Sequence, residues 1–367
     1  MRIAFDCQAF VLQSYGGVSR YFTRLIEGLL SQSQIVTVIA PLHRNNYITA
    51  LPKEVVCGRY INGYPGKTAR LFLAYNQIIS SVKTSRWKPE VVHETYYSGV
   101  SSSPKNCPTV VTVYDMIHEL YPEQMTFTDN TAKNKRKSIE RADHIICISE
   151  NTRHDLIKIY GTPSNKISVV HLGFDSFEID KNKSSTLKQK ERPFILYVGV
   201  RSKYKNFTGL IKAVASSGKL RCDFDIIAFG GGGFTNTERA EITSLGFTSN
   251  QVRNINGGDN ILGVLYNSAA AFVYPSIYEG FGIPPLEAMA QGCPVISSNT
   301  SSMPEVIGGA AEYFDPLNVE SMRCAIEVVV YSQARTKKLI KLGWDKLKEY
   351  SWDKCAVETL DVYDRLL

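Results

Sequence analysis

The sequence lacks any long apolar run, and no segment approaches the roughly 18–20 residues that a membrane-spanning helix needs. It also shows no signal peptide, because the chain opens on the strand-like segment Arg2–Phe5. Nor does it contain a recognisable nucleic-acid-binding motif. We therefore expect a cytoplasmic protein that can lie peripherally at the inner face of the membrane, with no nucleic-acid partner.

Closely spaced cysteine pairs are missing as well. The eight cysteines are scattered, none forms a C-x-x-C pair, and several lie in apolar runs such as Ile145–Ile148. Structural zinc sites usually take such pairs, and a cytoplasmic protein keeps its thiols reduced. We interpret the cysteines as reduced, structural thiols and expect no bound metal and no cofactor.

The chain of 367 residues is long enough for two domains, and its positive charge is uneven. Residues 1–175 hold 20 Lys and Arg against 14 Asp and Glu, which leaves only +1 of the formal net charge of +7 for the remainder. A basic first half can attract an anionic substrate or an anionic membrane surface.

Short apolar segments alternate with helix-like stretches, which indicates βα units and parallel sheets. The expected strands of the first half are 3–5, 35–40, 91–93, 110–113, 145–149 and 167–171. Those of the second half are 194–198, 224–229, 252–255, 271–274 and 295–297. Between the halves, residues 176–192 lose all periodicity and become charged, as a linker does. We predict an α/β protein with parallel-sheet domains at 1–175 and 193–350.

The most informative segment is Tyr274–Pro294, YPSIYEGFGIPPLEAMAQGCP. A strand-like run ends at Tyr274, a loop with Gly280 and Gly282 follows, and Pro285 favours a helix over about 285–291. Backbone N–H groups and the positive end of a helix dipole would then meet at one place, which suits a phosphate. The segment therefore predicts an anion-binding loop.

Two glutamates in this segment complete a family signature. Glu279, then Gly-Phe-Gly-Ile-Pro, then Glu287 with Ala-Met-Ala and Gly-Cys-Pro-Val resemble the donor site of retaining nucleotide-sugar glycosyltransferases of family 4. Eight residues apart, in a loop and in a helix, the glutamates suit two different parts of one ligand. The resemblance implies that Glu279 accepts hydrogen bonds from hydroxyls of the donor sugar and Glu287 from the ribose, as acceptor-only carboxylates can. It also implies that the loop between them contacts the donor through Gly280, Phe281, Gly282 and Ile283.

The resemblance further implies the GT-B fold, in which two Rossmann-like domains face one another across a cleft. In that fold the final helix, here 351–367 with Ser351 as a possible N-cap, crosses back to complete the first domain. The resemblance covers essentially the whole chain, although its specific motifs follow residue 195.

Further candidate donor contacts follow two other strand-like runs. Arg201 and Lys205 lie just after Val198, where two cations would neutralise a leaving diphosphate. The resemblance implies that they are the pyrophosphate-binding pair, and a solvated loop is the alternative. In the first half, Gly16 and Gly17 precede a helix and let the backbone approach a ligand closely. The resemblance implies that this loop contacts the donor diphosphate.

Two patterns leave alternatives open. Gly230–Gly233 lacks the spacing of a dinucleotide fingerprint, so Gly230 either lies near the nucleotide or belongs to a simple turn. Asp223-Phe224-Asp225 matches the D-x-D with which other glycosyltransferases hold a metal. We interpret these acids as structural, because alternate residues at the start of a strand point to the same face.

The strand at 110–113 ends where the chain departs from the family. Many relatives carry a histidine immediately before the aspartate, and here Tyr114 precedes Asp115. His118 is the nearest imidazole, and it either touches substrate or serves as a structural donor. Asp115 is a candidate to line the cleft.

A helix-like stretch farther on is rich in cations. Their spacing spreads charge around the helix, which favours a solvated surface over a membrane-docking face. These residues are Lys133, Lys135, Arg136, Lys137 and Arg141.

Together these patterns predict a retaining, metal-independent hexosyltransferase. The Gly-Phe-Gly-Ile-Pro variant resembles mannosyltransferases of bacterial surface polysaccharides, lipopolysaccharide and capsule among them, so GDP-mannose is the first donor we expect. The expected acceptor is a growing glycan or a lipid-linked glycan. A catalytically silent nucleotide-sugar-binding protein of the same fold is the alternative, and the poor glycine fingerprint disfavours a dinucleotide-dependent oxidoreductase. The candidate catalytic residues are Glu279, Arg201, Lys205, His118 and Asp115.

Overall fold

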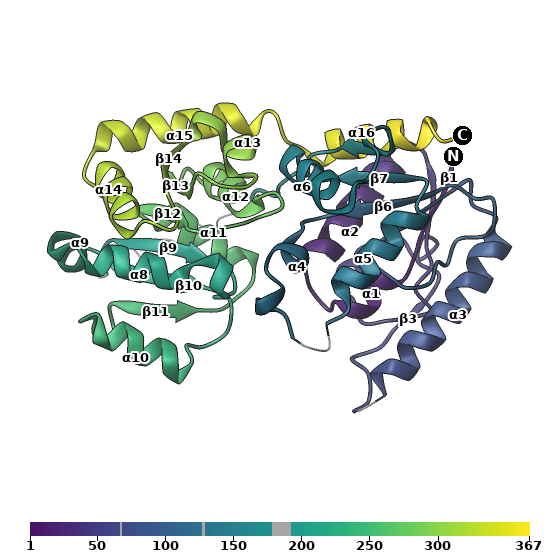
Figure 1. The fold of residues 1–367 in the computed structure, drawn as a ribbon, viewed down its shortest axis with the longest axis horizontal. Helices are drawn as coiled ribbons and strands as arrows, with labels where there is room; N and C mark the ends of the chain where they lie inside the picture. Colours follow the sequence, from purple (N-terminus) through teal and green to yellow (C-terminus); the bar gives the residue numbers. More distant parts are fainter. Residues whose placement is uncertain (67, 127–128, 178–191) are drawn as a thin grey trace. The chain divides into compact units, whose positions relative to one another are not determined.

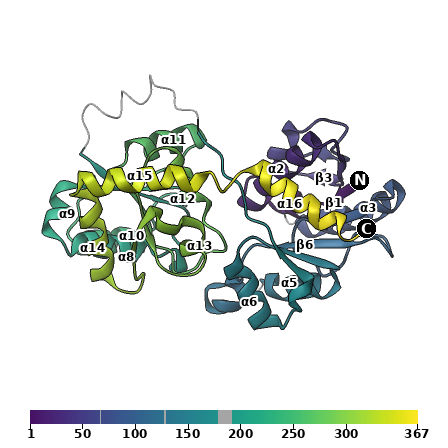
Figure 2. The same ribbon diagram turned by 90° about the horizontal axis from the view of Figure 1, so that it is seen from above.

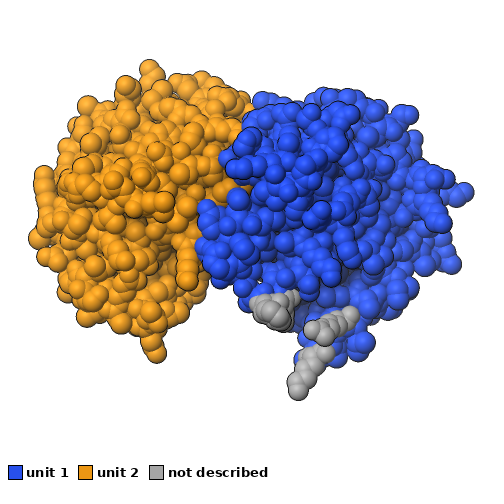
Figure 3. Space-filling view, in the orientation of Figure 1, with its two compact units in different colours: residues 1–173, 351–367 blue, residues 174–350 orange. Residues whose placement is uncertain are grey.

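Each half of the chain builds one parallel sheet, flanked by helices (Figure 1). The computed structural model describes residues 1–66, 68–126, 129–177 and 192–367. These form two units, which Figure 3 colours separately: unit 1 is residues 1–173 with 351–367, and unit 2 is residues 174–350. The two parallel-sheet α/β domains expected from the sequence are confirmed. The predicted linker at 176–192 lies almost wholly outside the described residues.

In the described part of unit 1, six parallel strands form a sheet in the order β2-β1-β5-β6-β7-β8. The strands are β1 (Arg2–Phe5), β2 (Ile35–Val38), β5 (Val91–Glu94), β6 (Thr109–Val113), β7 (His144–Cys147) and β8 (Ile167–Val169). A separate short pair joins β3 (Leu42–His43) to β4 (Arg59–Tyr60). The helices are α1 (Gln8–Leu12), α2 (Gly17–Ser31), α3 (Ala69–Trp87), α4 (Ile117–Leu120), α5 (Thr131–Arg141), α6 (Glu150–Tyr160) and α16 (Trp352–Asp364).

In unit 2, the described residues form a second six-stranded parallel sheet in the order β11-β10-β9-β12-β13-β14. The strands are β9 (Phe194–Val198), β10 (Asp225–Phe229), β11 (Val252–Ile255), β12 (Ala271–Tyr274), β13 (Val295–Ser298) and β14 (Ala311–Phe314). The helices are α8 (Phe207–Ala215), α9 (Gly218–Asp223), α10 (Asn236–Ser244), α11 (Asp259–Ser268), α12 (Ile283–Ala290), α13 (Met303–Ile307), α14 (Val319–Val330) and α15 (Gln333–Leu347).

Every strand expected from an apolar run is present, because strands covered by helices on both faces read as nearly continuous apolar segments. The sequence did not predict β3, β4 or β14. These are short segments with polar residues, and β14 lies at the edge of its sheet. Within the described residues, no helix is long and apolar enough to cross a membrane.

The final helix α16 packs against α2 within unit 1 (Figure 2). Ser351 caps it as predicted, since its side chain accepts a hydrogen bond from the amide of Lys354. Gly28 of α2 permits the close approach, because a Cβ at this position would lie 2.6 Å from the Ala356 Cβ. The contact thus depends on a residue without a side chain.

A buried hydrogen-bond chain also fastens α16 to the sheet. The Nδ1 of His93, on β5, lies 2.6 Å from the Tyr363 hydroxyl, and its Nε2 lies 2.9 Å from Thr112 Oγ1. Burial lowers the pKa of His93 to about 3. The imidazole is therefore held in its neutral form.

We expect His93 to make unit 1 less stable in acid. An unfolded imidazole titrates near pH 6.5, so below that pH the unfolded chain takes up a proton that the folded chain does not. The free energy of unfolding should fall by about 1.4 kcal/mol per pH unit from this group alone as the pH drops toward 3. The variant His93→Gln should lose this slope.

Denaturant unfolding of both proteins at several pH values between about 6.5 and 4.5 measures the difference. Other titrating groups, including buried Asp6, are present in both proteins and cancel. If the free energy of unfolding changed with pH to the same extent in both proteins, the role assigned to His93 would be contradicted.

Candidate functional site

The sheet of unit 2 brings two predicted site residues together. The chain order reverses between β9 and β12, which are neighbours in the sheet. Loops leaving the carboxyl ends of two such strands meet at a crevice that commonly binds ligands in open α/β sheets. Here the loop after β9 carries Lys205, and the loop after β12 carries Glu279. Lys205 Nζ lies 2.5 Å from Glu279 Oε1, and the two side chains are only 18% and 10% exposed.

A run of hydroxyl side chains after β13 holds the Glu279 loop in place. We call Ser298, Thr300, Ser301 and Ser302 the hydroxyl clamp. Hydroxyls of Ser298, Thr300 and Ser302 donate to backbone carbonyl oxygens at 276, 277, 279 and 281 over 2.6–2.9 Å. Ser301 Oγ accepts from the Glu279 amide at 3.0 Å and donates to its carbonyl. The sequence reasoning missed this role, although five hydroxyl residues among the six positions of SSNTSS were its signal.

The helix after this loop begins earlier than expected. α12 spans Ile283–Ala290 rather than 285–291, so its two prolines occupy the second and third positions and supply no N–H there. Gly282 precedes the helix with φ +112°, a conformation that disfavours any side chain. The helix end therefore offers fewer amide donors to an anion than the sequence suggested.

Glu287 lies in α12, buried, with the Tyr266 hydroxyl 3.5 Å from its Oε2. It therefore comes from a different element than Glu279, as predicted. Phe281 and Gly280 are buried in the loop between them, and Ile283 begins the helix.

Arg201 is engaged by the glycine cluster. Its guanidinium donates to the carbonyl oxygens of Gly230 at 2.9 Å, Gly231 at 3.3 Å, Gly232 at 2.9 Å and Gly233 at 3.0 Å. Its Nε donates to Glu238 Oε1 at 2.6 Å, and the side chain is only 4% exposed. Three consecutive glycines adopt positive φ, which turns their carbonyls toward the cation. Gly230 thus has a structural contact here, and its role in donor binding remains a prediction.

The glycine pair of unit 1 lies at the start of α2. Gly16 is the N-cap in an extended conformation and Gly17 is the first helical residue. Gln13 Oε1 accepts from the amide of Ser19 at 3.1 Å, and a Cβ on Gly16 would lie 2.3 Å from that same oxygen. Gly16 therefore leaves room for the Gln13 side chain to fold over the helix end, whereas a Cβ at Gly17 would meet no neighbour within 4 Å.

A buried carboxylate marks the place where strand order reverses in unit 1. Asp6 follows β1 and Thr95 follows β5, its neighbour in the sheet. Asp6 Oδ1 accepts from the Thr95 amide at 2.8 Å and from the Thr95 hydroxyl at 2.5 Å. Burial, and next the nearby Glu94, raise the pKa of Asp6 to about 7. The sequence reasoning did not single out this residue, which follows its strand without any motif.

The Asp115–His118 turn is held by a lysine that was predicted to lie on a solvated surface. Lys135 of α5 is fully buried, and its Nζ donates to the Asp115 carbonyl at 2.8 Å and to Glu119 Oε2 at 2.7 Å. His118 Nε2 lies 3.4 Å from Asp129 Oδ2, and its side chain is 21% exposed. Asp115 Oδ1 accepts from the amide of Ile117, the first residue of the short helix α4, at 3.0 Å.

The solvated-surface interpretation is therefore wrong for two cations of α5. Lys135 pairs internally, and Arg141 forms an ion pair with buried Glu94. Their charges are compensated by acceptors at the end of β5 and after β6, which the residue spacing within α5 could not predict. The expectation does fit Arg136, whose ion pair with Glu140 is mostly exposed.

Tyr114 is a packing residue. It is buried, and its hydroxyl donates to the Thr95 carbonyl at 2.9 Å. Rings of Tyr21, Tyr96 and Tyr97 lie within 6.1–6.3 Å of it. Burial first, and then the neighbouring tyrosines, raise its pKa well above the ordinary value, so the phenol stays protonated.

The D-x-D acids lie away from these loops. Asp225 begins β10, and so lies at the opposite edge of the sheet from Lys205 and Glu279. Its carboxylate lies 3.6 Å from Arg192 and 3.8 Å from Arg253. Asp223 accepts from the Tyr331 hydroxyl at 2.9 Å.

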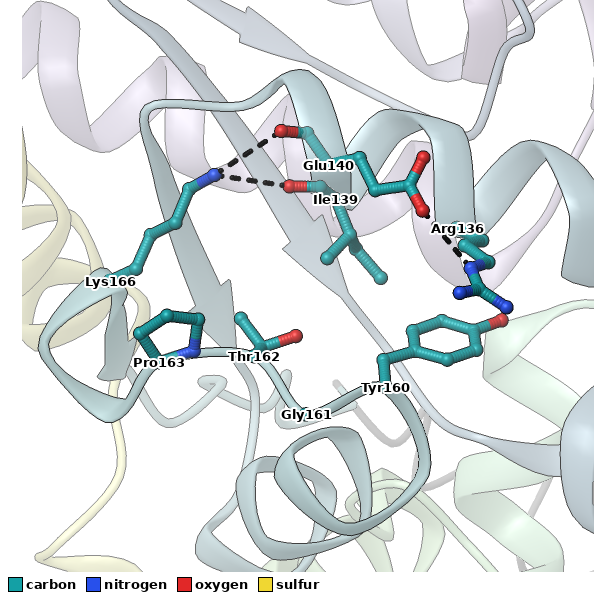
Figure 4. Close-up of a pocket in the computed structure, with 8 residues that line it drawn as sticks. All are labelled: Arg136, Ile139, Glu140, Tyr160, Gly161, Thr162, Pro163 and Lys166. Carbon is teal, nitrogen blue, oxygen red and sulfur yellow. Dashed lines mark hydrogen bonds and ion pairs between the residues drawn. The ribbon is translucent and has the colours of Figure 1, made fainter.

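A pocket of about 220 Å³ also lies away from the predicted site (Figure 4). It is lined by the ends of α5 and α6, where Lys166 Nζ donates to the carbonyl oxygens of Ile139 at 3.3 Å and Glu140 at 3.5 Å. Those residues precede β7 and β8, so the pocket lies at the amino edge of the unit 1 sheet. Its lysine serves as a cap for α5.

Two family models match the chain in succession. The model described as Glycosyltransferase Family 4 matches residues 15–176, and that described as Glycosyl transferases group 1 matches residues 178–343. O-antigen chain mannosyltransferase B of Escherichia coli is 29% identical over 242 residues, which are 64% of this chain and 64% of that protein. The serotype-specific mannosyltransferase WbdA of Escherichia coli is 28% identical over 288 residues, 75% of this chain but only 35% of that protein.

Among solved structures, Anabaena HepE in complex with UDP and glucose has a similar fold. Its TM-score is 0.75 at 17% identity, and the match covers 99% of both chains. The succession of the two matching models, the two parallel-sheet units and the mannosyltransferase relatives agree. This chain belongs to the glycosyltransferases of family 4, which have the GT-B fold.

Proposed function

We propose that this glycosyltransferase moves a hexose, with mannose the first candidate, from a nucleoside-diphosphate sugar to a hydroxyl of a growing surface glycan. The observation that carries the proposal is the Lys205–Glu279 pair at the point where strand order reverses in unit 2. The choice of mannose rests on the printed names of relatives, and that of a nucleotide-sugar donor on the likeness to a UDP-bound structure.

The ion pair suits a ligand that carries both hydroxyls and phosphates. An arriving diphosphate competes with Glu279 for the Lys205 ammonium, while sugar hydroxyls donate to the Glu279 carboxylate. Each group therefore exchanges one partner for another, and neither charge is left buried and unpaired. Glu287 would hold the ribose, and Arg201 would act on the diphosphate directly or through the glycine loop that it holds.

In the proposed reaction, the bond from the anomeric carbon to the diphosphate oxygen breaks, and a bond to the acceptor oxygen forms on the same face of the sugar. The acceptor proton passes to the leaving diphosphate. The protein then contributes position and charge stabilisation and needs no side-chain base. Asp225 lies at the other edge of its sheet, which supports a reaction without a D-x-D metal.

The alternative is a protein that binds nucleotide sugars without transferring them. A screen of several sugar nucleotides, measuring both affinity and transfer to candidate glycans, distinguishes the two. Binding without turnover for every donor and acceptor would favour the alternative.

We expect the two glutamates to have separable effects. Glu279→Gln should lower kcat/KM by about 10–100-fold, because hydrogen bonds to a charged group that position the sugar are lost. Glu287→Gln should mainly weaken GDP binding, by about 10-fold. Calorimetry with GDP and transfer kinetics with GDP-mannose provide the measurements.

The matched control is Glu312→Gln on β14, which alters an ion pair with Arg335 of α15 and should leave both quantities unchanged. If Glu279→Gln showed wild-type kinetics, the assignment of Glu279 to the donor site would be wrong.

Transfer should persist in excess chelator, because Lys205 and Arg201 provide the positive charge that a metal would otherwise supply. The assay compares rates with and without chelator at equal ionic strength. A rate that vanishes and returns with added Mn²⁺ or Mg²⁺ would contradict this expectation.

His118→Ala should retain transfer within about 100-fold of the wild type, because a dedicated base would contribute roughly 10²–10⁴-fold. His118 is partly buried and is paired to Asp129 across 3.4 Å, so its loss should not unfold unit 1. Comparing the pH profile of kcat between the variant and the wild type provides a second test for a catalytic base. Normal donor affinity with no detectable transfer would make His118 a catalytic residue.

A further inference from the structure

Helix α3 of unit 1 packs with a polar side inward. Asn76, Ser80 and Thr84 follow one another at every fourth position and are all buried. Asn76 exchanges hydrogen bonds with both backbone groups of Leu42, at 2.8 and 3.1 Å, and Ser80 donates to the Ile39 carbonyl at 3.1 Å. These side chains satisfy the backbone that leaves β2. The inner side of α3 therefore departs from the usual arrangement, in which the residues facing the core are mainly apolar.

The opposite side of α3 exposes large apolar residues. Leu71 is 72% exposed, Tyr75 46%, Ile78 64% and Val82 44%. Their spacing of four, three and four residues places them in one stripe on the helix, about 16 Å long. Figure 1 shows α3 along the outside of unit 1. Isolated exposed apolar residues are ordinary, but a continuous stripe marks an interaction surface.

The charged residues within α3 itself are all cations. Residues Ala69–Trp87 contain no Asp or Glu. Arg86 is exposed one turn beyond Val82, and exposed Lys88 follows the helix. An apolar stripe beside cations is the pattern of a helix that lies in the interface of an anionic bilayer.

A second copy of the chain is the rival occupant, because the four-three-four spacing would also fit a two-helix seam. Such seams usually pair cations with acids across their flanks, and α3 offers no acid for that purpose. Two α3 helices would bring like charges together. The cations of α5, Lys135 and Arg141, compensate buried acids, so that helix is a poorer candidate for membrane docking.

We propose that the stripe Leu71, Tyr75, Ile78 and Val82 of α3 is a docking surface for an anionic membrane. The inward polar side fixes how α3 is oriented on unit 1, and this orientation presents the stripe outward. The middle of α3 contacts α1, where Gln77 Oε1 accepts from Gln8 Nε2 at 2.7 Å. α1 in turn follows the carboxyl end of β1, so docking would hold this edge of the sheet near the membrane. That this serves a lipid-linked acceptor rests on the proposed function.

The test is co-flotation of the full chain with vesicles of phosphatidylcholine, either alone or with about one-third phosphatidylglycerol. The wild type should bind the anionic vesicles and should bind the neutral ones at least about 10-fold more weakly. Its binding to the anionic vesicles should weaken as salt rises. The double variant Leu71→Glu with Ile78→Glu should lose at least about 10-fold in binding to anionic vesicles, since it removes inserted apolar area and adds repulsion.

The matched control is Val328→Glu with Val357→Glu, which makes the same charge change at exposed helical positions of α14 and α16. It should bind vesicles nearly as well as the wild type. Circular dichroism checks that both double variants are folded. Equal loss in the control, equal binding of the α3 variant and wild type, or no preference for anionic vesicles would overturn the proposal. So would a dimer in solution that the α3 variant dissociates while neither protein binds vesicles.

Donor affinity without vesicles separates this proposal from the proposed function. GDP binding should be unchanged in the α3 double variant. If no sugar nucleotide binds any of these proteins, the donor assignment fails, and the vesicle results still decide the docking surface.

Discussion

All strands of a parallel sheet end at the same edge, and this constraint decides where chemistry can occur in both units. Where the order of strands reverses, two neighbouring loops leave in opposite directions and open a place for a ligand. In unit 2 that place holds Lys205 and Glu279, and in unit 1 it holds Asp6 and Thr95. Residues far apart in sequence therefore meet without any local motif joining them.

Buried charge gives these loops a fixed shape. Arg201 gathers the carbonyls of a glycine run, and Lys135 ties the Asp115 backbone to Glu119. Each cation is almost inaccessible to water, so removing its partner would leave a buried charge uncompensated. The hydroxyl clamp also fixes the shape of the Glu279 loop, but with neutral hydroxyl groups. The loops are thus positioned before any ligand arrives, which is what catalysis by positioning requires.

Helix α3 shows how the same packing can leave an apolar surface outside. Its inner side satisfies backbone groups beyond β2 with an amide and a hydroxyl, and the stripe Leu71, Tyr75, Ile78 and Val82 on the other side is exposed. A transferase that acts on a lipid-linked glycan must reach its acceptor at the bilayer surface. On the docking proposal, the exposed apolar stripe and the basic C-terminal end of α3 would provide weak, reversible attachment to the bilayer.

Local patterns were enough to predict the α/β class, the Glu279–Glu287 signature and every strand except β3, β4 and β14, because buried strands and glycine loops leave strong signals in the sequence. The remaining features depend on contacts between distant elements. The tertiary structure paired Lys205 with Glu279, buried Lys135, and turned the apolar stripe of α3 outward. The physical reason is common to all three. A side chain's environment depends on partners from other strands and helices, and α3 has apolar residues on more than one side, so periodicity could not tell which side faces the sheet.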